Sequence, residues 1–84
     1  MHAFVDIFVE SQLMDEVIQV LSKINDVEEL FEVTGEFDLV ALVGASDIES
    51  FRDTLKNKIM KINGVKSTVT SIVLSAHKGP KCST

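Results

Sequence analysis

Two short segments of the chain, residues 3–9 and 37–45, are apolar at nearly every position. A continuous apolar run of this length is typical of a β-strand that is covered on both faces. Such strands lie in the middle of a sheet, so the chain is constrained to fold around two central strands taken from these segments. At 84 residues it forms one domain with a modest core.

Two of the segments between the predicted strands have the sequence pattern of helices. Apolar residues recur at three- and four-residue steps over residues 13–24, which predicts an amphipathic helix with Ser11 as its N-cap. The sequence Ser46-Asp47-Ile48-Glu49 matches a capping box, so a second helix is expected to begin at Ser46 and to end before Gly64. Its expected buried stripe is Ile48, Phe51, Leu55, Ile59 and Ile62.

Two further strands complete the pattern. Residues 27–34 are acidic and predict an edge strand with one wet face, and residues 65–74 are rich in β-branched side chains. The order strand, helix, strand, strand, helix, strand predicts an α+β, ferredoxin-like βαββαβ fold, a four-stranded antiparallel sheet with two helices on one face. The domain is expected to span residues 1–75 and a C-terminal tail residues 76–84.

One face of the predicted sheet has no helix to cover it. Phe4 and Phe8 alternate with Val5 and Ile7, so one of these pairs must point to the open face. An exposed apolar patch usually marks an interface. We therefore expect a homo-oligomer built on a two-fold dimer through the sheet.

Charge and composition narrow the class of protein. The chain has 13 acidic and 8 basic residues and a net charge of −5. A negative protein repels the phosphate backbone, so direct nucleic-acid binding is not expected. No window reaches the roughly 18 apolar residues of a membrane span, and no secretory leader is visible. A single Cys82 fits the cytoplasm. His2 and His77 have no partner at metal-ligand spacing, so neither a metal nor another cofactor is expected.

The junction between the second and third predicted strands contains the most informative carboxylate. Gly35-Glu36 reads as a two-residue type II′ turn, because that turn needs positive φ at its first central position. Asp38 follows on the face of Val40 and Leu42. A carboxylate here either accepts hydrogen bonds from nearby backbone N–H groups, pairs with a Lys, or meets a ligand.

Two sequence elements resemble a known family. Val33-Thr34-Gly35-x-x-Asp38 and Gly64-Val65-x-x-Thr68-x-Thr70 are similar to motifs of the effector-binding domain of the Lrp/AsnC transcription regulators, and the resemblance covers about residues 3–78. It implies dimers through the sheet, rings of dimers, and amino-acid effectors held between neighbouring dimers near the Gly-x-x-Asp loop.

By the same resemblance, Gly35 and Asp38 line the ligand site, with Asp38 offering its charge to an α-ammonium group, and Thr68 and Thr70 supply hydroxyls. Glu36 and Phe37 join this set by proximity alone. Family members normally carry a helix-turn-helix domain before this region. The chain begins at the first strand, so we expect a stand-alone version that can co-assemble with full-length regulators.

Three functions stay open. The first is an oligomeric amino-acid-binding module that modulates regulators of this family without binding DNA. The second is a small ferredoxin-like enzyme, such as an acylphosphatase-like hydrolase or a dimeric α+β-barrel monooxygenase, although no catalytic constellation is visible and the only Arg, Arg52, lies inside a predicted helix. The third is a ligand-free oligomeric scaffold in which Asp38 is structural.

Overall fold

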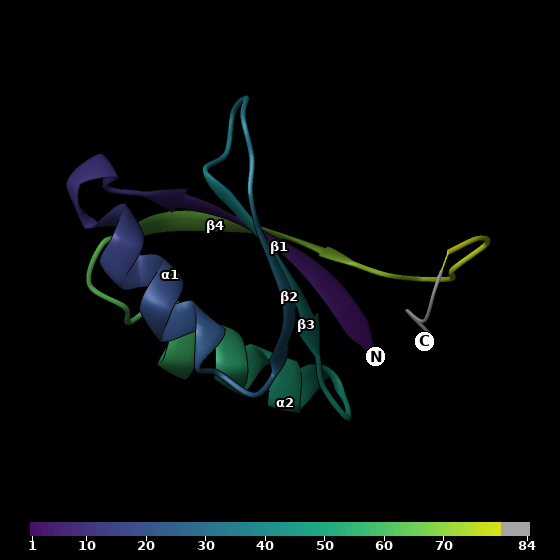
Figure 1. Ribbon diagram of the computed structural model, residues 1–84. Helices are drawn as coiled ribbons and strands as arrows, with labels where there is room; N and C mark the ends of the chain where they lie inside the picture. Colours follow the sequence, from purple (N-terminus) through teal and green to yellow (C-terminus); the bar gives the residue numbers. More distant parts are fainter. Residues whose placement is uncertain (80–84) are drawn as a thin grey trace.

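The two apolar segments form the central strands of the sheet. The computed structural model describes residues 1–79, in which β1 (His2–Val9) and β3 (Leu39–Gly44) lie between β2 (Val27–Glu32) and β4 (Val65–Ile72). The strand order is β2-β3-β1-β4 and every neighbouring pair is antiparallel (Figure 1). The ferredoxin-like α+β prediction is confirmed.

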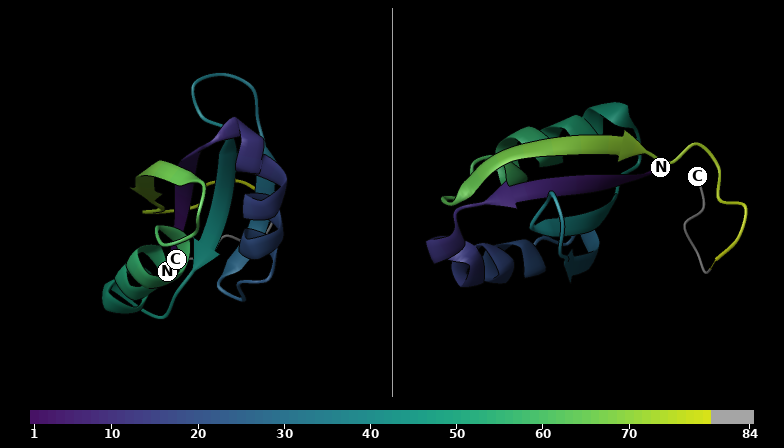
Figure 2. Two further views of the ribbon diagram at one scale, coloured as in Figure 1. Left: turned by 90° about the vertical axis from the view of Figure 1, so that its left-hand side faces the viewer. Right: turned by 90° about the horizontal axis from the view of Figure 1, so that it is seen from above.

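The helices pack on one face of this sheet. A 3₁₀ turn, η1 (Ser11–Leu13), leads into α1 (Met14–Ser22), and α2 (Ile48–Asp53) continues into a π-helical turn, η2 (Thr54–Ile59). Figure 2 shows α1 on the side of β2 and α2 on the side of β4. Within the described residues no helix is long and apolar enough to cross a membrane.

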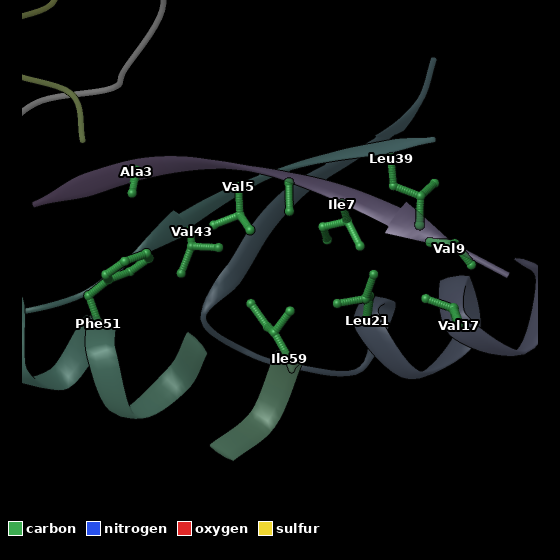
Figure 3. Close-up of a cluster of buried hydrophobic side chains, with 11 residues drawn as sticks. Ala3, Val5, Ile7, Val9, Val17, Leu21, Leu39, Val43, Phe51 and Ile59 are labelled. Atoms are coloured by element: carbon green, nitrogen blue, oxygen red, sulfur yellow. The ribbon is translucent and has the colours of Figure 1, made fainter. Parts of the chain in front are cut away.

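The core lies between the helices and the inward side of the central strands. Each fully buried Val, Leu or Ile contributes about 1.5–3 kcal/mol to the folded state. The cluster in Figure 3 joins β1 and β3 to both helical segments: Ala3, Val5, Ile7, Val9, Val17, Leu21, Leu39, Ala41, Val43, Phe51 and Ile59.

The predicted helix caps are displaced. Ser11 is the first residue of the 3₁₀ turn, and neither η1 nor α1 has a side-chain cap, so the Ser11 prediction is wrong. For α2 the cap is Asp47, whose Oδ1 accepts from the Ser50 N–H at 2.8 Å. Ser46 lies one residue too early and makes a hydroxyl contact with Ser50 instead. Asp47 has an extended backbone, so its side chain reaches the N–H of Ser50, three residues later. The prediction had given this capping role to Ser46.

The buried stripe of the second helix also differs from the prediction. Ile48 is 55% exposed, whereas Thr54 is buried, and Phe51 and Ile59 are buried as predicted. The Met60 N–H donates to the Leu55 carbonyl, the i→i+5 bond of a π turn. Because this turn is wider than an α turn, positions beyond residue 54 cannot be placed by a 3.6-residue period.

The open face of the sheet is largely apolar, as the alternation in β1 predicts, although Asp6 of β1 also lies on it, directly opposite Val69. Phe4 and Val69 are 38% and 49% exposed, and Phe31 on β2 is 49% exposed. Phe4 lies directly opposite Leu42, which is almost buried although it is on the same face. Side chains on this face therefore shelter one another but leave a patch in contact with solvent.

The chain turns sharply at Gly64, just before β4, and continues past the end of that strand. Gly64 has φ +108°, and a Cβ there would stand 2.7 Å from Val17 Cγ2, so this stop requires glycine. β4 ends at Ile72, two residues earlier than predicted. Residues 73–79 form no helix or strand, and the rest of the predicted tail, 80–84, lies outside the described residues.

Candidate functional site

The β2–β3 connection is longer than the sequence predicts. Six residues separate Glu32 from Leu39, and the Val33 N–H donates to the Asp38 carbonyl at 3.0 Å, which leaves residues 34–37 as a four-residue loop. The two-residue type II′ turn is therefore wrong. The hairpin needs more chain because β2 and β3 pair only as far as Glu32 and Leu39. In Figure 1 the loop projects beyond the sheet.

Gly35 has a backbone reason to be glycine. Its φ of +111° lies in the region that side chains with a Cβ rarely adopt, and no atom lies within 4 Å of where a Cβ would stand. The requirement is thus conformational and does not arise from crowding. The space beside Gly35 is open, which leaves the loop backbone accessible from that side.

Asp38 ties the loop to the end of β1. Its N–H donates to the Ile7 carbonyl at 3.1 Å, and its Oδ2 accepts from the Val9 N–H at 2.8 Å. Because the last β1–β3 backbone pair is Ile7 with Leu39, the carboxylate takes the N–H that lies just beyond the ladder. The interpretation that a nearby backbone N–H holds this carboxylate is correct for one oxygen. The other oxygen, Oδ1, has no hydrogen-bond partner among residues 1–79.

The remaining loop residues differ in their surroundings. Glu36 is exposed near the tip of the loop. The ring of Phe37 packs on Phe8 of β1, with ring centroids 4.7 Å apart and planes inclined at 48°. An aromatic contact of this kind stabilises the base of the loop. Gly35, Glu36, Phe37 and Asp38 are therefore one local unit anchored to the end of β1.

The two threonines lie elsewhere. Thr68 pairs with Ile7 and Thr70 with Val5, so both are on the helix side of β4 and are half-buried. β1 separates them from β3 and its loop. Within one copy the structure groups the four loop residues but does not bring the threonines to them.

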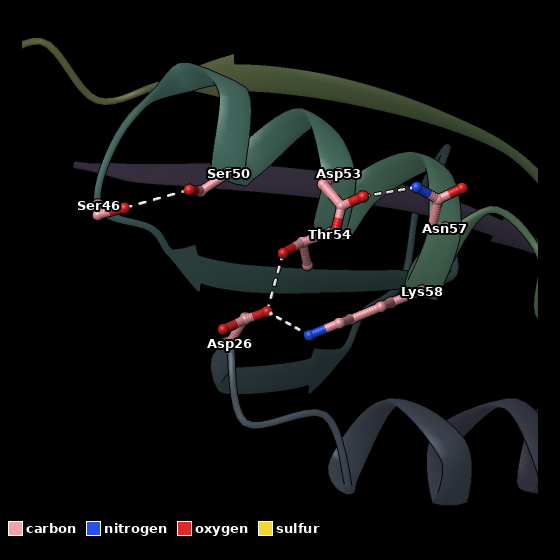
Figure 4. A network of polar contacts seen from close by, with 7 residues as sticks. All are labelled: Asp26, Ser46, Ser50, Asp53, Thr54, Asn57 and Lys58. Carbon is pink, nitrogen blue, oxygen red and sulfur yellow. Dashed lines mark hydrogen bonds and ion pairs between the residues drawn. The ribbon is translucent and has the colours of Figure 1, made fainter.

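A second polar site lies at the opposite end of β3, where sequence reasoning placed nothing. Asp26, in the connection between α1 and β2, accepts from Thr54 Oγ1 at 2.8 Å and from Lys58 Nζ at 3.1 Å, both through Oδ2 (Figure 4). These contacts, the Thr54 hydroxyl first and the Lys58 ammonium second, hold the pKa of Asp26 below its usual value.

A hollow of about 500 Å³ opens beside this network. Its lining carries three carboxylates and one ammonium group and comes from the α1–β2 connection, the β3–α2 connection and the second helix: Asp26, Ala45, Ser46, Glu49, Ser50, Asp53, Thr54 and Lys58. The sequence signal was a polar Thr54 on the buried side of a helix, four residues before Lys58. It could not name Asp26, which is 28 residues from Thr54.

Metal binding finds no support in this geometry. In the part of the chain from residue 1 to residue 79, no three His, Cys, Asp or Glu side chains gather as a metal site would require. Two carboxylates can supply hydrogen bonding and charge: Asp38 at the β2–β3 loop, whose Oδ2 accepts one backbone N–H, and Asp26, whose Oδ2 accepts from a hydroxyl and an ammonium group.

Comparison with known proteins gives this geometry a context. The family model of the Lrp/AsnC ligand binding domain matches residues 2–81. An uncharacterized HTH-type transcriptional regulator of Pyrococcus horikoshii, PH0140, is 34% identical over 76 residues, which are 90% of this chain and 48% of the regulator. The chain thus spans about half the length of the curated regulators that it matches.

Solved structures of similar proteins have the same fold. TTHA0845 of Thermus thermophilus superposes with a TM-score of 0.86 at 31% identity, over 93% of this chain and 98% of that one. Escherichia coli AsnC superposes with a TM-score of 0.89 at 26% identity, over 95% of this chain and 54% of AsnC.

An enzyme is also among the relatives. A stretch of 54 residues is 39% identical to part of the homocitrate synthase of Saccharolobus islandicus, and it spans 12% of that enzyme. The family model, in contrast, covers nearly the whole chain. This chain belongs to the Lrp/AsnC ligand-binding domain family.

Proposed function

We propose that the chain is an effector-binding and oligomerisation module that takes a free amino acid at the β2–β3 loop and thereby modulates transcription regulators of the Lrp/AsnC type. The observation that carries this proposal is the state of Asp38, which uses Oδ2 for the Val9 N–H and keeps Oδ1 without a partner among residues 1–79. A fixed carboxylate with one oxygen left over is suited to an α-ammonium group.

The surroundings of Asp38 support the same role. The bond to Val9 and the contact of Phe37 with Phe8 hold the carboxylate in place before a ligand arrives, which lowers the entropy cost of binding. Open space beside Gly35 gives a small molecule access to the loop backbone. The half-buried Thr68 and Thr70 lie apart from this loop, so in our proposal they contribute only where a neighbouring copy supplies the rest of the site.

Assembly is the second half of the proposal. The exposed Phe4, Phe31 and Val69 fit a two-fold dimer through the open face of the sheet, since burying apolar area is the main favourable term in such an interface. Dimers would then associate into a larger ring, alone or with full-length regulators in the cytoplasm. An amino acid can shift that assembly only if it binds one state more tightly than another.

A scaffold without a ligand is the second candidate, and one specific contact favours it. The bond from the Val9 N–H to Asp38 gives the carboxylate a structural role that needs no ligand. An enzymatic role has less support, because the matched part of homocitrate synthase is a small fraction of that enzyme.

Thermal melting and light scattering of the full chain, with each of the common free amino acids, test the proposal. We expect one of them to raise the melting temperature or change the particle mass, and Asp38→Ala to lose the response while still dimerising. Asp26→Asn is the matched control, because it removes a carboxylate from the other polar site. An oligomer that no amino acid alters would favour the scaffold.

A further inference from the structure

A carboxylate, that of Asp6, lies in the middle of the open face of the sheet. Phe4 and Phe8 flank it on the same face of β1. Its neighbours across the two ladders are Val40 on β3 and Val69 on β4. Apolar side chains gain free energy when a contact removes them from water, whereas an ionised carboxylate loses it. Asp6 therefore opposes the apolar contact that its neighbours favour.

Within a single copy this carboxylate depends on water. Asp6 is half-buried, and neither a hydrogen bond nor an ion pair joins its side chain to any other of residues 1–79. None of the buried side-chain oxygens in this part of the chain lacks a partner, so both carboxylate oxygens of Asp6 still reach solvent. A contact that covers the open face removes this solvent and leaves the charge without a partner from its own chain.

The open face offers no Lys or Arg beside Asp6. On β3 and β4 the adjacent side chains of this face are apolar or carry a hydroxyl group. The four strands contain a single Lys or Arg residue, Lys66, which lies at the start of β4 beyond Ser67. The other titratable groups of the face lie farther along it: His2, which pairs with Glu28 at 3.0 Å, Glu29 opposite Leu42, and Asp38, which holds the Val9 N–H.

We propose that Asp6 makes the pairing of two copies through the open face depend on protons. A two-fold contact centred on this face covers the Asp6 side chains of both copies and places them in the same central part of the interface. When both are ionised, lost hydration and like charge oppose pairing. A proton taken up by either carboxyl group lowers both costs, so the dimer holds such a proton more tightly than the separate copies do.

The sign of the pH dependence follows from this difference. An aspartate carboxyl group in water ordinarily loses its proton near a pH of about 4. Because the dimer binds more protons than two separate copies, association strengthens as pH falls and weakens as pH rises. The dimer is that of the proposed function, on which this inference rests, and Asp6 sets the pH at which it forms.

The test compares three variants of the full chain with the wild type. Asp6→Asn keeps the size of the side chain and removes its charge. Asp6→Leu replaces the carboxylate with an apolar side chain. Asp15→Asn is the matched control, because Asp15 is exposed on α1, in the helical layer and away from the open face.

Sedimentation velocity would give the dissociation constant of the dimer at about pH 5 and about pH 8, with circular dichroism to verify that each protein stays folded. We expect the wild type and Asp15→Asn to pair at least about tenfold more weakly at the higher pH. The constant of Asp6→Asn should change by less than about threefold. At the higher pH, Asp6→Leu should pair at least about tenfold more tightly than the wild type.

Three results would overturn the role of Asp6. The first is a wild-type dissociation constant that is the same at both pH values, which leaves the dimer of the proposed function intact. The second is a pH dependence that survives in Asp6→Asn, which assigns the effect to His2 and Glu28, since histidine gains a charge in the same range. The third is a wild type that stays a monomer at both pH values while Asp6→Leu dimerises, which reserves the face for a partner with a basic group.

A wild type and an Asp6→Leu variant that are both monomers would overturn the dimer of the proposed function, and the role of Asp6 with it. Where Asp6→Leu precipitates, Asp6→Ser replaces it, because serine also removes the charge and adds less apolar area. Asp6→Ser should pair more tightly than the wild type at about pH 8. Equal or weaker pairing would show that the charge of Asp6 does not oppose the contact.

Discussion

A carboxylate lies near each end of β3, and the two have different roles in the structure. At one end, Oδ2 of Asp26 accepts from Thr54 and Lys58 and joins the α1–β2 connection to the second helix. At the other end, Oδ2 of Asp38 accepts a single backbone N–H, that of Val9. Both carboxylates are engaged through Oδ2 alone, but Asp26 already has the ammonium group of Lys58 beside it, whereas no Lys or Arg of residues 1–79 lies within ion-pairing distance of Asp38. The first arrangement is suited to stability and the second to a cationic group of a ligand.

The largest expected effect is on the Asp26 end. Asp26→Ala should lower the free energy of unfolding by about 2 kcal/mol, because Thr54 is only 3% exposed and its hydroxyl loses its acceptor. Urea denaturation measures the change. In the Asp26→Ala background, Thr54→Val should recover part of the loss by removing the unsatisfied hydroxyl. A change within about 0.5 kcal/mol of wild type would mean that the network is only a surface feature.

A smaller effect is expected at the Asp38 end. Asp38→Ala removes the acceptor of the buried Val9 N–H and should cost about 1.5 kcal/mol in urea denaturation. Asp38→Asn retains a carbonyl oxygen that can accept this bond, so its stability should be close to that of the wild type. Equal losses in both variants would show that the charge, and not the hydrogen bond, holds the loop.

Gly35→Ala probes the loop backbone without touching either carboxylate. We expect a loss of about 1 kcal/mol in thermal or urea unfolding, because alanine disfavours a φ of +111°. Gly79→Ala is the matched control, since Gly79 has φ +108° but follows the last strand. The stability of Gly79→Ala should be unchanged, because no strand pairing depends on the backbone at residue 79. An equal loss at both positions would show that the positive φ itself, and not its place in the hairpin, sets the cost.

The smallest expected effect is a pH dependence that belongs to Asp26. Because its folded-state pKa is lowered, its stabilising contribution is complete above the unfolded pKa of about 4 and is lost as pH falls through the lower folded value. Asp26→Asn should therefore be less stable than wild type at neutral pH, and the gap should close in acid. Asp47, whose pKa is also lowered by the Ser50 N–H, is common to both proteins and cancels. A constant gap from neutral pH down to about pH 2 would contradict this.

The sequence predicts the fold well because the apolar period is a local signal. The double-sided apolar runs placed β1 and β3 in the centre. The alternation of Phe4 and Phe8 with Val5 and Ile7 indicated an apolar open face but left open which pair points to it, and the structure shows that Val5 and Ile7 are the buried pair. The errors occur where two adjacent residues could have the same role. At the start of the second helix, Ser46 was the predicted cap, whereas the cap in the structure is Asp47.

The candidate site was less predictable because its geometry depends on distant contacts. The loop at Gly35 could be located, but its length depends on where the pairing of β2 with β3 ends. The bond from Val9 to Asp38 spans 29 residues, and no period encodes it. The hollow beside Asp26 likewise forms only when three separate segments meet.

The most direct measurement is calorimetric titration of wild type and Asp38→Asn with the amino acid that stabilises the wild type, alongside an analogue that lacks its α-amine. Our account predicts that Asp38→Asn folds and dimerises normally but binds that amino acid at least about tenfold more weakly, a loss of about 1.4 kcal/mol. It also predicts weak binding of the analogue to both proteins. Binding by Asp38→Asn as tight as that of the wild type would contradict a ligand role for the charge of Asp38.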